Sequence, residues 1–368
     1  MVTIAFTGGG TGGHIFPGLA LLPQLRNQFS SPSIFWIGSK KGMDRSIVEA
    51  AGLEFFGIPS GKLRRSFSLR NFFDFFRVAA GFFAARSILK RKKPVLLFSK
   101  GGFVSVPPCA AAASLGIPVF THESDYSPGL ATRINAIFAE KIFVPYEATG
   151  KFFKEKIRDK VIAAGNPIRA EFRDADPQRG RAFLGLGPGD RILLVLGGSL
   201  GAREVNALIQ ETLPELTKDY VVIHQTGDQS GGSADGEGKN GERYQVYPFI
   251  KEELPHILAA AELVICRCGA GTLWECASLR KPLIMIPLRG SGTRGDQVEN
   301  ARIFEEAGAG IGLHGAGSAA DQLAEIVSVL AGDEKKREAM STAAGNLVFI
   351  DASIRIVNEL KKYIEEKI

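Results

Sequence analysis

A short apolar segment followed directly by a glycine-rich loop occurs twice in this chain, about half a chain apart. The first copy is VTIAF followed by TGGGTGGH, residues 2–14, and the second is RILLVL followed by GGSLGA, residues 191–202. Each loop leads into a segment whose apolar residues have helical spacing. A buried strand, a tight glycine turn and a helix open a Rossmann-like domain. The repeat therefore predicts two α/β domains of similar construction.

Short apolar runs alternate with longer amphipathic ones through the first half of the chain. The runs VTIAFT, SIFWIG, PVLLFS and PVFTHE are strand-like, and the helical patterns cover 14–29, 43–51, 108–115 and 128–139. This order is typical of a parallel sheet with helices on both faces. We expect the domain boundary near 165–169 and an amphipathic C-terminal helix that packs back across the domain junction.

Composition excludes several classes of protein. The net charge of +6 favours anionic partners but does not by itself indicate nucleic acid. The four cysteines form no CxxC pair and have no nearby histidine cluster, so we expect reduced structural thiols and no metal site. Residues 101–120 are uncharged, but their prolines and glycines favour a loop, a short helix and a strand over a membrane span.

Residues 226–241 are expected to form a solvated loop.

The first glycine loop matches G-x-G-x-x-G at Gly8, Gly10 and Gly13. A dinucleotide site would also need an acidic residue at the end of the next strand, which here ends Gly38-Ser39-Lys40. The NAD interpretation therefore lacks its ribose anchor, although an NADP-like site stays open. No GxxxxGK[ST] motif is present, so a P-loop is also excluded. A diphosphate, an oxygen-rich acceptor or a turn without a ligand remain as interpretations.

Two segments of the C-terminal half carry polar residues at helix starts. In CGAGTLWE, Gly271 and Thr272 begin a helix and Glu275 follows one turn later, where it could meet a ribose diol or simply complement the helix dipole. In GDQVENA, Gln297 and its neighbours could bind sugar hydroxyls, and Asp296 could equally be an N-cap. These positions are candidates for a sugar-nucleotide site.

Six segments, in this order along the chain, resemble the MurG family of bacterial glycosyltransferases. They are GGGTGGHIFPGLAL, SKGGFVSVPPCAAA, THESDYSPGLATR, AGNPIR, LGGSLGAREVN, and CGAGTLWE followed by GDQVENA. The resemblance implies the α/β GT-B architecture, with two Rossmann-like domains facing a cleft and a C-terminal helix that returns to the N-terminal domain. The implied domains are 1–165 for acceptor and membrane, 166–345 for UDP-GlcNAc, and 346–368 for the returning helix.

The resemblance implies a single inverting displacement. The C4 hydroxyl of MurNAc in lipid I, an undecaprenyl-linked acceptor, would take GlcNAc from UDP-GlcNAc and give lipid II for peptidoglycan. The implied partners are these two substrates, an anionic membrane surface and other cell-wall synthesis proteins, without nucleic acid, cofactor or obligatory divalent metal. The implied location is peripheral, at the cytoplasmic face of the cell membrane. Alternatives are another GT-B enzyme, such as a diacylglycerol glycosyltransferase or a UDP-GlcNAc epimerase, and a non-catalytic nucleotide-binding protein.

Donor contacts implied by the resemblance lie in the C-terminal half. The backbone at Ile250 would read uracil, and Glu275 would hold the ribose hydroxyls. Ser199, with the helix start at Gly271 and Thr272, would contact the diphosphate. Gln297 would contact the hydroxyls of GlcNAc.

Acceptor and cleft contacts implied by the resemblance lie in the N-terminal half. The loop of Thr11, Gly12, Gly13 and His14 would face the acceptor, and Arg169 would lie at the interdomain cleft. Many relatives carry HEQN where this chain has HESD, residues 122–125, so Asp125 places a carboxylate where an amide would contact the donor sugar.

His14 is the candidate general base. The positive potential at a helix start should keep its imidazole neutral and able to accept a proton at about pH 7. The alternative is that His14 only caps or packs at the turn, in which case Glu123 or Asp125 would take the role. For His122 we expect a buried, hydrogen-bonded side chain.

Residues 62–93 contain ten basic residues, one acidic residue and seven phenylalanines. This composition suits an anionic lipid surface, with Arg64, Arg65, Phe72, Phe73 and Phe76 as the candidate membrane contacts. The alternative is a core helix with a solvated basic end.

Overall fold

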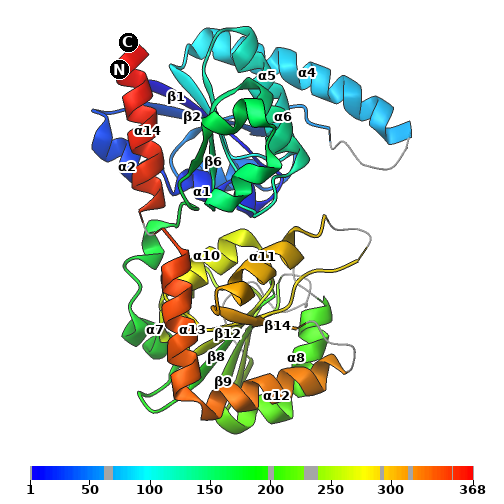
Figure 1. Ribbon diagram of the computed structural model, residues 1–368, viewed down its shortest axis with the longest axis vertical. Coiled ribbons are helices and arrows are strands. Elements are labelled where there is room, and N and C mark those ends of the chain that lie inside the picture. Colours follow the sequence, from blue (N-terminus) through cyan, green and yellow to red (C-terminus); the bar gives the residue numbers. More distant parts are fainter. Residues whose placement is uncertain are drawn as a thin grey trace. The chain divides into compact units, whose positions relative to one another are not determined.

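The computed structural model describes residues 2–61, 69–197, 203–227, 239–290, 294–313, 318–349 and 351–367, without side-chain detail at 69–73 and 239–241. The chain divides into two compact units. Met1–Arg169 and Phe349–Ile368 form the N-terminal unit, and Ala170–Val348 form the C-terminal unit. Each unit is built around a seven-stranded sheet (Figure 1).

The sheet of the N-terminal unit has the order β3-β2-β1-β4-β5-β6-β7, and all its strands are parallel. Its strands are β1 Thr3–Thr7, β2 Ser33–Ser39, β3 Glu54–Ile58, β4 Leu96–Ser99, β5 Val119–His122, β6 Ala139–Val144 and β7 Val161–Ala163. Its helices are α1 Phe16–Leu19, α2 Leu22–Gln28, α3 Asp44–Ala50, α4 Leu69–Lys92, α5 Val106–Ser114, α6 Leu130–Phe138 and α14 Ala352–Lys367, and its 3₁₀ segments are η1 Gly12–His14, η2 Phe103–Ser105, η3 Glu147–Phe152 and η4 Glu155–Lys160.

Alternate residues of β1 enter two different cores, as the period of a strand requires. Ile4 and Phe6 pack with α2 and with four buried side chains of α14, namely Ile356, Val357, Leu360 and Ile364. Ala5 faces the other core, with Ala85 of α4 and Ala111 of α5. Figure 1 shows α14, in red, beside α2, in blue. The last helix of the chain is therefore part of the N-terminal unit.

The sheet of the C-terminal unit has the order β10-β11-β9-β8-β12-β13-β14, and its only antiparallel pair among the described strands is β10 with β11. Its strands are β8 Ile192–Leu196, β9 Val221–Gln225, β10 Lys239–Gly241, β11 Tyr244–Tyr247, β12 Leu263–Cys266, β13 Leu283–Met285 and β14 Gly310–Gly312. Its helices are α7 Pro177–Leu184, α8 Arg203–Asp219, α9 Leu254–Ala260, α10 Ala270–Ser278, α11 Asp296–Glu306, α12 Ala319–Gly332 and α13 Glu334–Leu347, with a 3₁₀ segment η5 at Ala170–Phe172.

The strand order reverses direction once in each sheet, between β1 and β4 and between β8 and β12. In open α/β sheets, ligands bind outside the carboxyl ends of the strands at this reversal point. The glycine loops of the sequence follow these very strands. Two doubly wound sheets confirm the predicted α/β class, and they place one candidate binding edge in each unit.

Two predicted elements differ from the structure. The segment expected as one helix over 14–29 begins at the last residue of η1 and contains two separate helices, α1 and α2. The break between α1 and α2 follows because Pro23 has no N–H to donate to the carbonyl of Leu19. In the loop expected over 226–241, Lys239–Gly241 instead form β10 at the edge of the sheet. Residues 228–238 of that loop lie outside the described residues.

By length and composition, one helical stretch of the described chain could span a membrane, Glu334–Lys367. It consists of α13 and α14, which belong to different units. The apolar face of α14 is buried in the N-terminal core. Residues 101–120 contain η2, α5 and the start of β5, in agreement with the expected loop, helix and strand.

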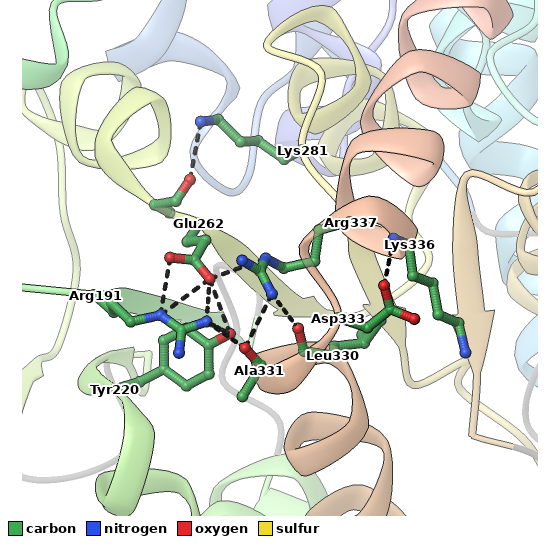
Figure 2. Close-up of polar contacts among 10 residues, drawn as sticks. Arg191, Tyr220, Glu262, Lys281, Leu330, Ala331, Asp333, Lys336 and Arg337 are labelled. Atoms are coloured by element: carbon green, nitrogen blue, oxygen red, sulfur yellow. Dashed lines mark hydrogen bonds and ion pairs between the residues drawn. The ribbon is translucent and has the colours of Figure 1, made fainter.

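A cluster of charged residues lies at the amino ends of the strands in the C-terminal unit (Figure 2). Glu262, which precedes β12, accepts hydrogen bonds from Arg191, before β8, and from Tyr220, before β9. Arg337 of α13 pairs with the same carboxylate at 3.0 Å, and Arg191 and Arg337 both donate to the carbonyl of Ala331. Burial opposes the charge on Glu262, but Arg191, together with Arg337 and Tyr220, holds its pKa below its usual value. The cluster ties the turn between α12 and α13 to the sheet.

Candidate active site

His14 lies between two glycine loops at the carboxyl edge of the N-terminal sheet. The first loop follows β1, and the second, Gly101-Gly102, follows the neighbouring strand β4. A Cβ placed on Gly102 would lie 2.9 Å from Cδ2 of His14, and one on Gly101 would lie 3.9 Å from its Nδ1. The half-buried imidazole therefore rests directly on the second loop.

The first loop is anchored by two side chains from distant parts of the sequence. Asp44, fully buried at the start of α3, accepts hydrogen bonds from the N–H of Gly10 and of Ser39, each at 2.9 Å. Nε1 of Trp36 donates to the carbonyl of Gly8 at 2.9 Å. A Cβ at Gly9 would lie 1.9 Å from Oδ2 of Asp44, so only glycine fits there. These contacts hold the loop in one conformation beneath His14.

The second loop is held by a buried network of hydroxyl and amide groups. Nδ2 of Asn135 donates to Oγ of Ser99 at 3.1 Å and to Oγ of Ser105 at 2.7 Å. Ser99 accepts from the N–H of Gly101, and Ser105 donates to the carbonyl of Gly102. Gly102 has φ of +76°, which a side chain would strain. Both loops are thus rigidly built at the reversal point of the sheet.

His122 is the last residue of β5, the next strand in the sheet, and residues 123–125 form the turn that follows it. Glu123 accepts hydrogen bonds from the N–H groups of Ser124, Asp125 and Gly129, at 2.8, 3.1 and 2.9 Å. With its carboxylate committed to the backbone, Glu123 is a poor general base. Nε2 of His122 lies 2.8 Å from the carbonyl of Gly165, and burial, with the charge of Lys100, holds the pKa of His122 well below its usual value. His122 is the expected buried, hydrogen-bonded histidine.

Lys100 is a residue of this edge that sequence reasoning missed. It follows β4 directly, is 1% exposed, and donates from Nζ to Oγ of Ser124 at 2.7 Å. Burial lowers the pKa of Lys100 to about 8, against the opposing effect of the Glu123 and Asp125 carboxylates. A lysine directly after an apolar strand was the available signal. Asp44 was also missed, since its contact with Gly10 joins positions far apart in sequence.

The remaining acceptor-side candidates lie at or near this edge. Thr11 and Gly13 are exposed, and Gly12 is half-buried. Asp125 is half-buried in the turn after β5. The guanidinium of Arg169, at the end of the first segment of this unit, lies 5.1 Å from the ring centroid of Phe16 in α1.

On the donor side, α10 begins at the reversal point of the second sheet. Its N-cap is Gly269, which has no side chain. No N-cap side chain therefore accepts a hydrogen bond from the first N–H groups of this nine-residue helix. Among the described residues, no atom lies within 4 Å of a Cβ built on Gly269 or Gly271. Thr272 and Glu275 are half-buried on the same helix. The arrangement provides main-chain donors and the positive end of a helix dipole for an anion.

The other candidates for donor binding either form hydrogen bonds within the protein or lie outside the described residues. The N–H of Ile250 donates to Oε1 of Gln225 at 2.9 Å, so reading uracil with this donor requires Gln225 to release it. Oε1 of Gln297, in α11, accepts from the N–H of Leu288 at 2.9 Å. Asp296 is the first residue of α11, and its N-cap is Gly295. Ser199 lies outside the described residues.

The candidate membrane residues are only partly described. Arg64 and Arg65 lie outside the described residues, as do the side chains of Phe72 and Phe73. Phe76 of α4 is 56% exposed. All four cysteines are free and buried. The described residues contain no group of three or more His, Cys, Asp or Glu side chains arranged to hold a metal ion.

Comparison with family models accounts for both units. Residues 4–144 match the glycosyltransferase family 28 N-terminal domain, and residues 192–356 match the glycosyltransferase family 28 C-terminal domain. These matches cover most of the chain.

Individual relatives agree with the family models. A UDP-N-acetylglucosamine–N-acetylmuramyl-(pentapeptide) pyrophosphoryl-undecaprenol N-acetylglucosamine transferase of Treponema denticola is 50% identical over 324 residues, 84% of this chain and 83% of that protein. The protein of the same name from Treponema pallidum, strain Nichols, is 46% identical over 99% of this chain and 96% of its own length.

Solved structures share the fold. The crystal structure of Acinetobacter baumannii MurG superposes with a TM-score of 0.74 at 23% identity and covers 98% of this chain and 100% of that one. The UDP-GlcNAc 2-epimerase of Neisseria meningitidis, bound to UDP-GlcNAc, superposes with a TM-score of 0.67 at 15% identity, covering 98% and 100%. The fold is that of the GT-B glycosyltransferases, and the chain belongs to glycosyltransferase family 28, in the group of N-acetylglucosamine transferases that includes the two Treponema proteins.

Proposed function

We propose that this enzyme transfers GlcNAc from UDP-GlcNAc to the C4 hydroxyl of MurNAc in lipid I, giving lipid II. The observation that carries the proposal is the identity of 46% to a transferase of that name over 99% of the chain. The aligned residues include the glycine loops at the carboxyl ends of the strands in both sheets. The epimerase alternative rests on fold similarity at 15% identity.

His14 is the proposed general base. The acceptor hydroxyl gives its proton to the imidazole as its oxygen attacks C1 of GlcNAc, the C1–O bond to UDP breaks, and the configuration at C1 inverts. His14 suits this role because it is half-buried on a rigid support at the carboxyl edge of the N-terminal sheet. Glu123 is less suited, because both its carboxylate oxygens already accept hydrogen bonds from backbone N–H groups.

The start of α10 is the proposed site for the UDP diphosphate. The uncapped N–H groups after Gly269 and the helix dipole would stabilise the charge that develops on UDP as it leaves. Glu275, one turn along this helix, would accept hydrogen bonds from the ribose hydroxyls. Gln297 would bind the GlcNAc hydroxyls. With this stabilisation from the protein itself, we propose that a divalent metal is not obligatory.

Transfer of radiolabelled GlcNAc from UDP-GlcNAc to lipid I in detergent tests the proposal. We expect labelled lipid II, no labelled product with diacylglycerol, and the same rate with EDTA. Labelled diacylglycerol instead would establish the alternative transferase. Donor binding without transfer to any acceptor would contradict catalysis, and loss of the rate in EDTA would contradict the metal-independent account.

We also infer that the N-terminal unit docks on an anionic membrane surface, where a lipid-linked acceptor is reached. Three phenylalanines of α4 are largely exposed: Phe75, Phe76 and Phe83. The helix ends with Lys90, Arg91 and Lys92. Exposed aromatic side chains together with basic residues are typical of surfaces that enter the headgroup region of a bilayer.

Sedimentation with phosphatidylglycerol vesicles tests the membrane proposal. Charge reversal at Arg64, Arg65 and Arg70 should release most of the enzyme into the supernatant, and salt should do the same. Reversal of Lys251, Lys335 and Lys336, which are exposed in the C-terminal unit, changes the same number of charges and should leave sedimentation unchanged. Equal sedimentation of both variants and the parent protein would contradict the docking surface.

A further inference from the structure

Lys100 is placed where three strands of the N-terminal sheet end. Its N–H donates to the carbonyl of Thr7 at the end of β1, and its side chain reaches Ser124 after β5. A Cβ on Gly8 would lie 3.1 Å from the Cβ of Lys100, so the lysine also touches the first glycine loop. One side chain thus links the loop that carries His14 with the turn that carries Asp125.

Burying this ammonium group opposes folding unless it is well paired. Among the described residues, its side chain donates one hydrogen bond, to Oγ of Ser124, although an ammonium has three hydrogens to donate. Glu123 and Asp125 provide the compensating negative charge. Burial of this kind without full hydrogen bonding is typical of sites shaped for function at some loss of stability.

Lys281 is a buried lysine that serves as a structural comparison. It lies before β13, and its Nζ donates to the carbonyls of Ala259 and Ala261, at 2.6 and 2.9 Å. Figure 2 shows the side chain of Lys281 with one of these contacts. It therefore satisfies the carbonyls at the end of α9. Lys100, in contrast, holds a side-chain hydroxyl beside two carboxylates at the binding edge.

We propose that Lys100 is a positioning residue of the transfer reaction, which holds Ser124 and thereby fixes the segment that carries Asp125 at the edge of the sheet where His14 lies. The turn is short and stiff, because Glu123 bonds the N–H groups of Ser124 and Asp125, and Asn166 donates to the carbonyl of Ser124 at 2.9 Å. Movement of Ser124 therefore moves Asp125. The proposal rests on the proposed function and adds a residue to it.

The charge of Lys100 gives the proposal a pH signature. Its pKa is lowered to about 8, so the ammonium is present below that pH and is lost above it. The titratable groups that face it are Glu123 and Asp125, whose charge favours the ammonium, and His122, which stays neutral. His14 lies on the other side of the first glycine loop. Activity should therefore fall on the alkaline side as Lys100 loses its proton.

The test compares the variants Lys100→Met, Lys100→Arg and Lys281→Met with the parent enzyme. We expect the parent kcat/KM for lipid I to fall above about pH 8. Lys100→Met should lower kcat by about tenfold to a hundredfold and remove this alkaline fall. Lys100→Arg should restore part of the rate and move the fall to higher pH, because a guanidinium keeps its charge. Lys281→Met should keep the parent profile.

Hydrogen exchange gives a readout independent of the acceptor. Peptides covering 121–130 should exchange at least about fivefold faster in Lys100→Met than in the parent, and Lys281→Met should not change them. If Lys100→Met fails to fold, the parent alone should show extra exchange at 121–130 above about pH 8, measured against a core peptide covering 192–196. A parent-like pH profile or unchanged exchange would overturn the proposal. Absence of any parent transfer to lipid I would instead refute the proposed function, and exchange would still decide the role of Lys100.

Discussion

Glu262 and Lys100 both bring charge to the ends of parallel strands, but at opposite edges and with opposite degrees of pairing. The carboxylate of Glu262, at the amino ends of the C-terminal sheet, is met by two arginines and a tyrosine. The ammonium of Lys100, at the carboxyl ends of the N-terminal sheet, meets one hydroxyl among the described residues. The pKa of Glu262 moves to favour its charge, and that of Lys100 moves against it. The amino edge is arranged for stability and the carboxyl edge for chemistry.

The largest effect that tests this comparison is expected at His14. His14→Ala should lower kcat by about a hundredfold to ten-thousandfold, the usual contribution of a general base, with UDP-GlcNAc affinity and unfolding free energy unchanged. Steady-state kinetics measures kcat, UDP titration measures affinity at the donor site, and urea unfolding measures the free energy of unfolding. His256→Ala is the control, because this histidine accepts from the N–H of Asp176 in the other unit. Near-normal turnover of His14→Ala would assign His14 a packing role.

Breaking the amino-edge cluster should affect stability and leave catalysis intact. Glu262→Gln leaves Arg191 and Arg337 without their carboxylate, and should lower the free energy of unfolding by about 2 kcal/mol. Urea unfolding measures the loss, and kcat of the folded enzyme should not change. A drop in kcat with unaltered stability would reverse the assignment of the two edges.

The pH dependence of the stability difference between the parent and Glu262→Gln tests the ion pairs of Glu262 more sharply. The folded-state pKa of Glu262 lies below its unfolded value, so its contribution is present above that unfolded value, about 4.3, and is lost as pH falls through the folded-state pKa. The stability difference between the parent and Glu262→Gln should therefore shrink on acidification. A difference that stayed constant from pH 7 down to about pH 3 would show that the ion pairs contribute nothing.

The two buried lysines should behave alike in stability and differently in activity. Burial lowers the pKa of each to about 8 in the folded state, below the unfolded value of about 10.4. The folded protein releases these protons first, so each lysine adds stability as pH rises from about 8 to about 10.4. Replacing either by Met should remove a rise on the order of 2 kcal/mol, measured by urea unfolding at both ends of this range. Each variant keeps the rise from its remaining lysine, so its rise should be smaller than that of the parent. A rise as large as the parent's in both variants would contradict the burial of the charges.

A smaller effect on catalysis than that of His14→Ala is expected at the anchor of the first loop. Asp44→Asn replaces one acceptor oxygen with a donor, facing the N–H of either Gly10 or Ser39, and should cost about 1 to 3 kcal/mol. We expect kcat/KM to fall by about tenfold as the loop beneath His14 loosens. Asp333→Asn, which weakens the N-cap of α13, should cost about 1 kcal/mol without affecting kcat/KM. Equal kinetics in the two variants would show that Asp44 acts on stability alone.

Sequence periodicity predicted the two sheets because strand and helix patterns are local, and the motifs located His14, Gly271 and Glu275 at the edges where the structure has them. The break between α1 and α2 was missed because the apolar pattern continues through Pro23. Lys100 and Asp44 were missed for a different reason. Their roles depend on which strands become neighbours, and contacts such as that between Asp44 and Gly10 join residues far apart in the chain.

The position of α14 sets an order of events during synthesis. The sheet translated first needs four core side chains from the helix translated last, while the whole C-terminal unit lies between them in the chain. The C-terminal unit can therefore fold on the ribosome as soon as it emerges, but the core of the N-terminal unit, where Ile4 and Phe6 already meet α2, stays incomplete until the side chains of α14 are available. In this enzyme the half that is made first is the half that is completed last.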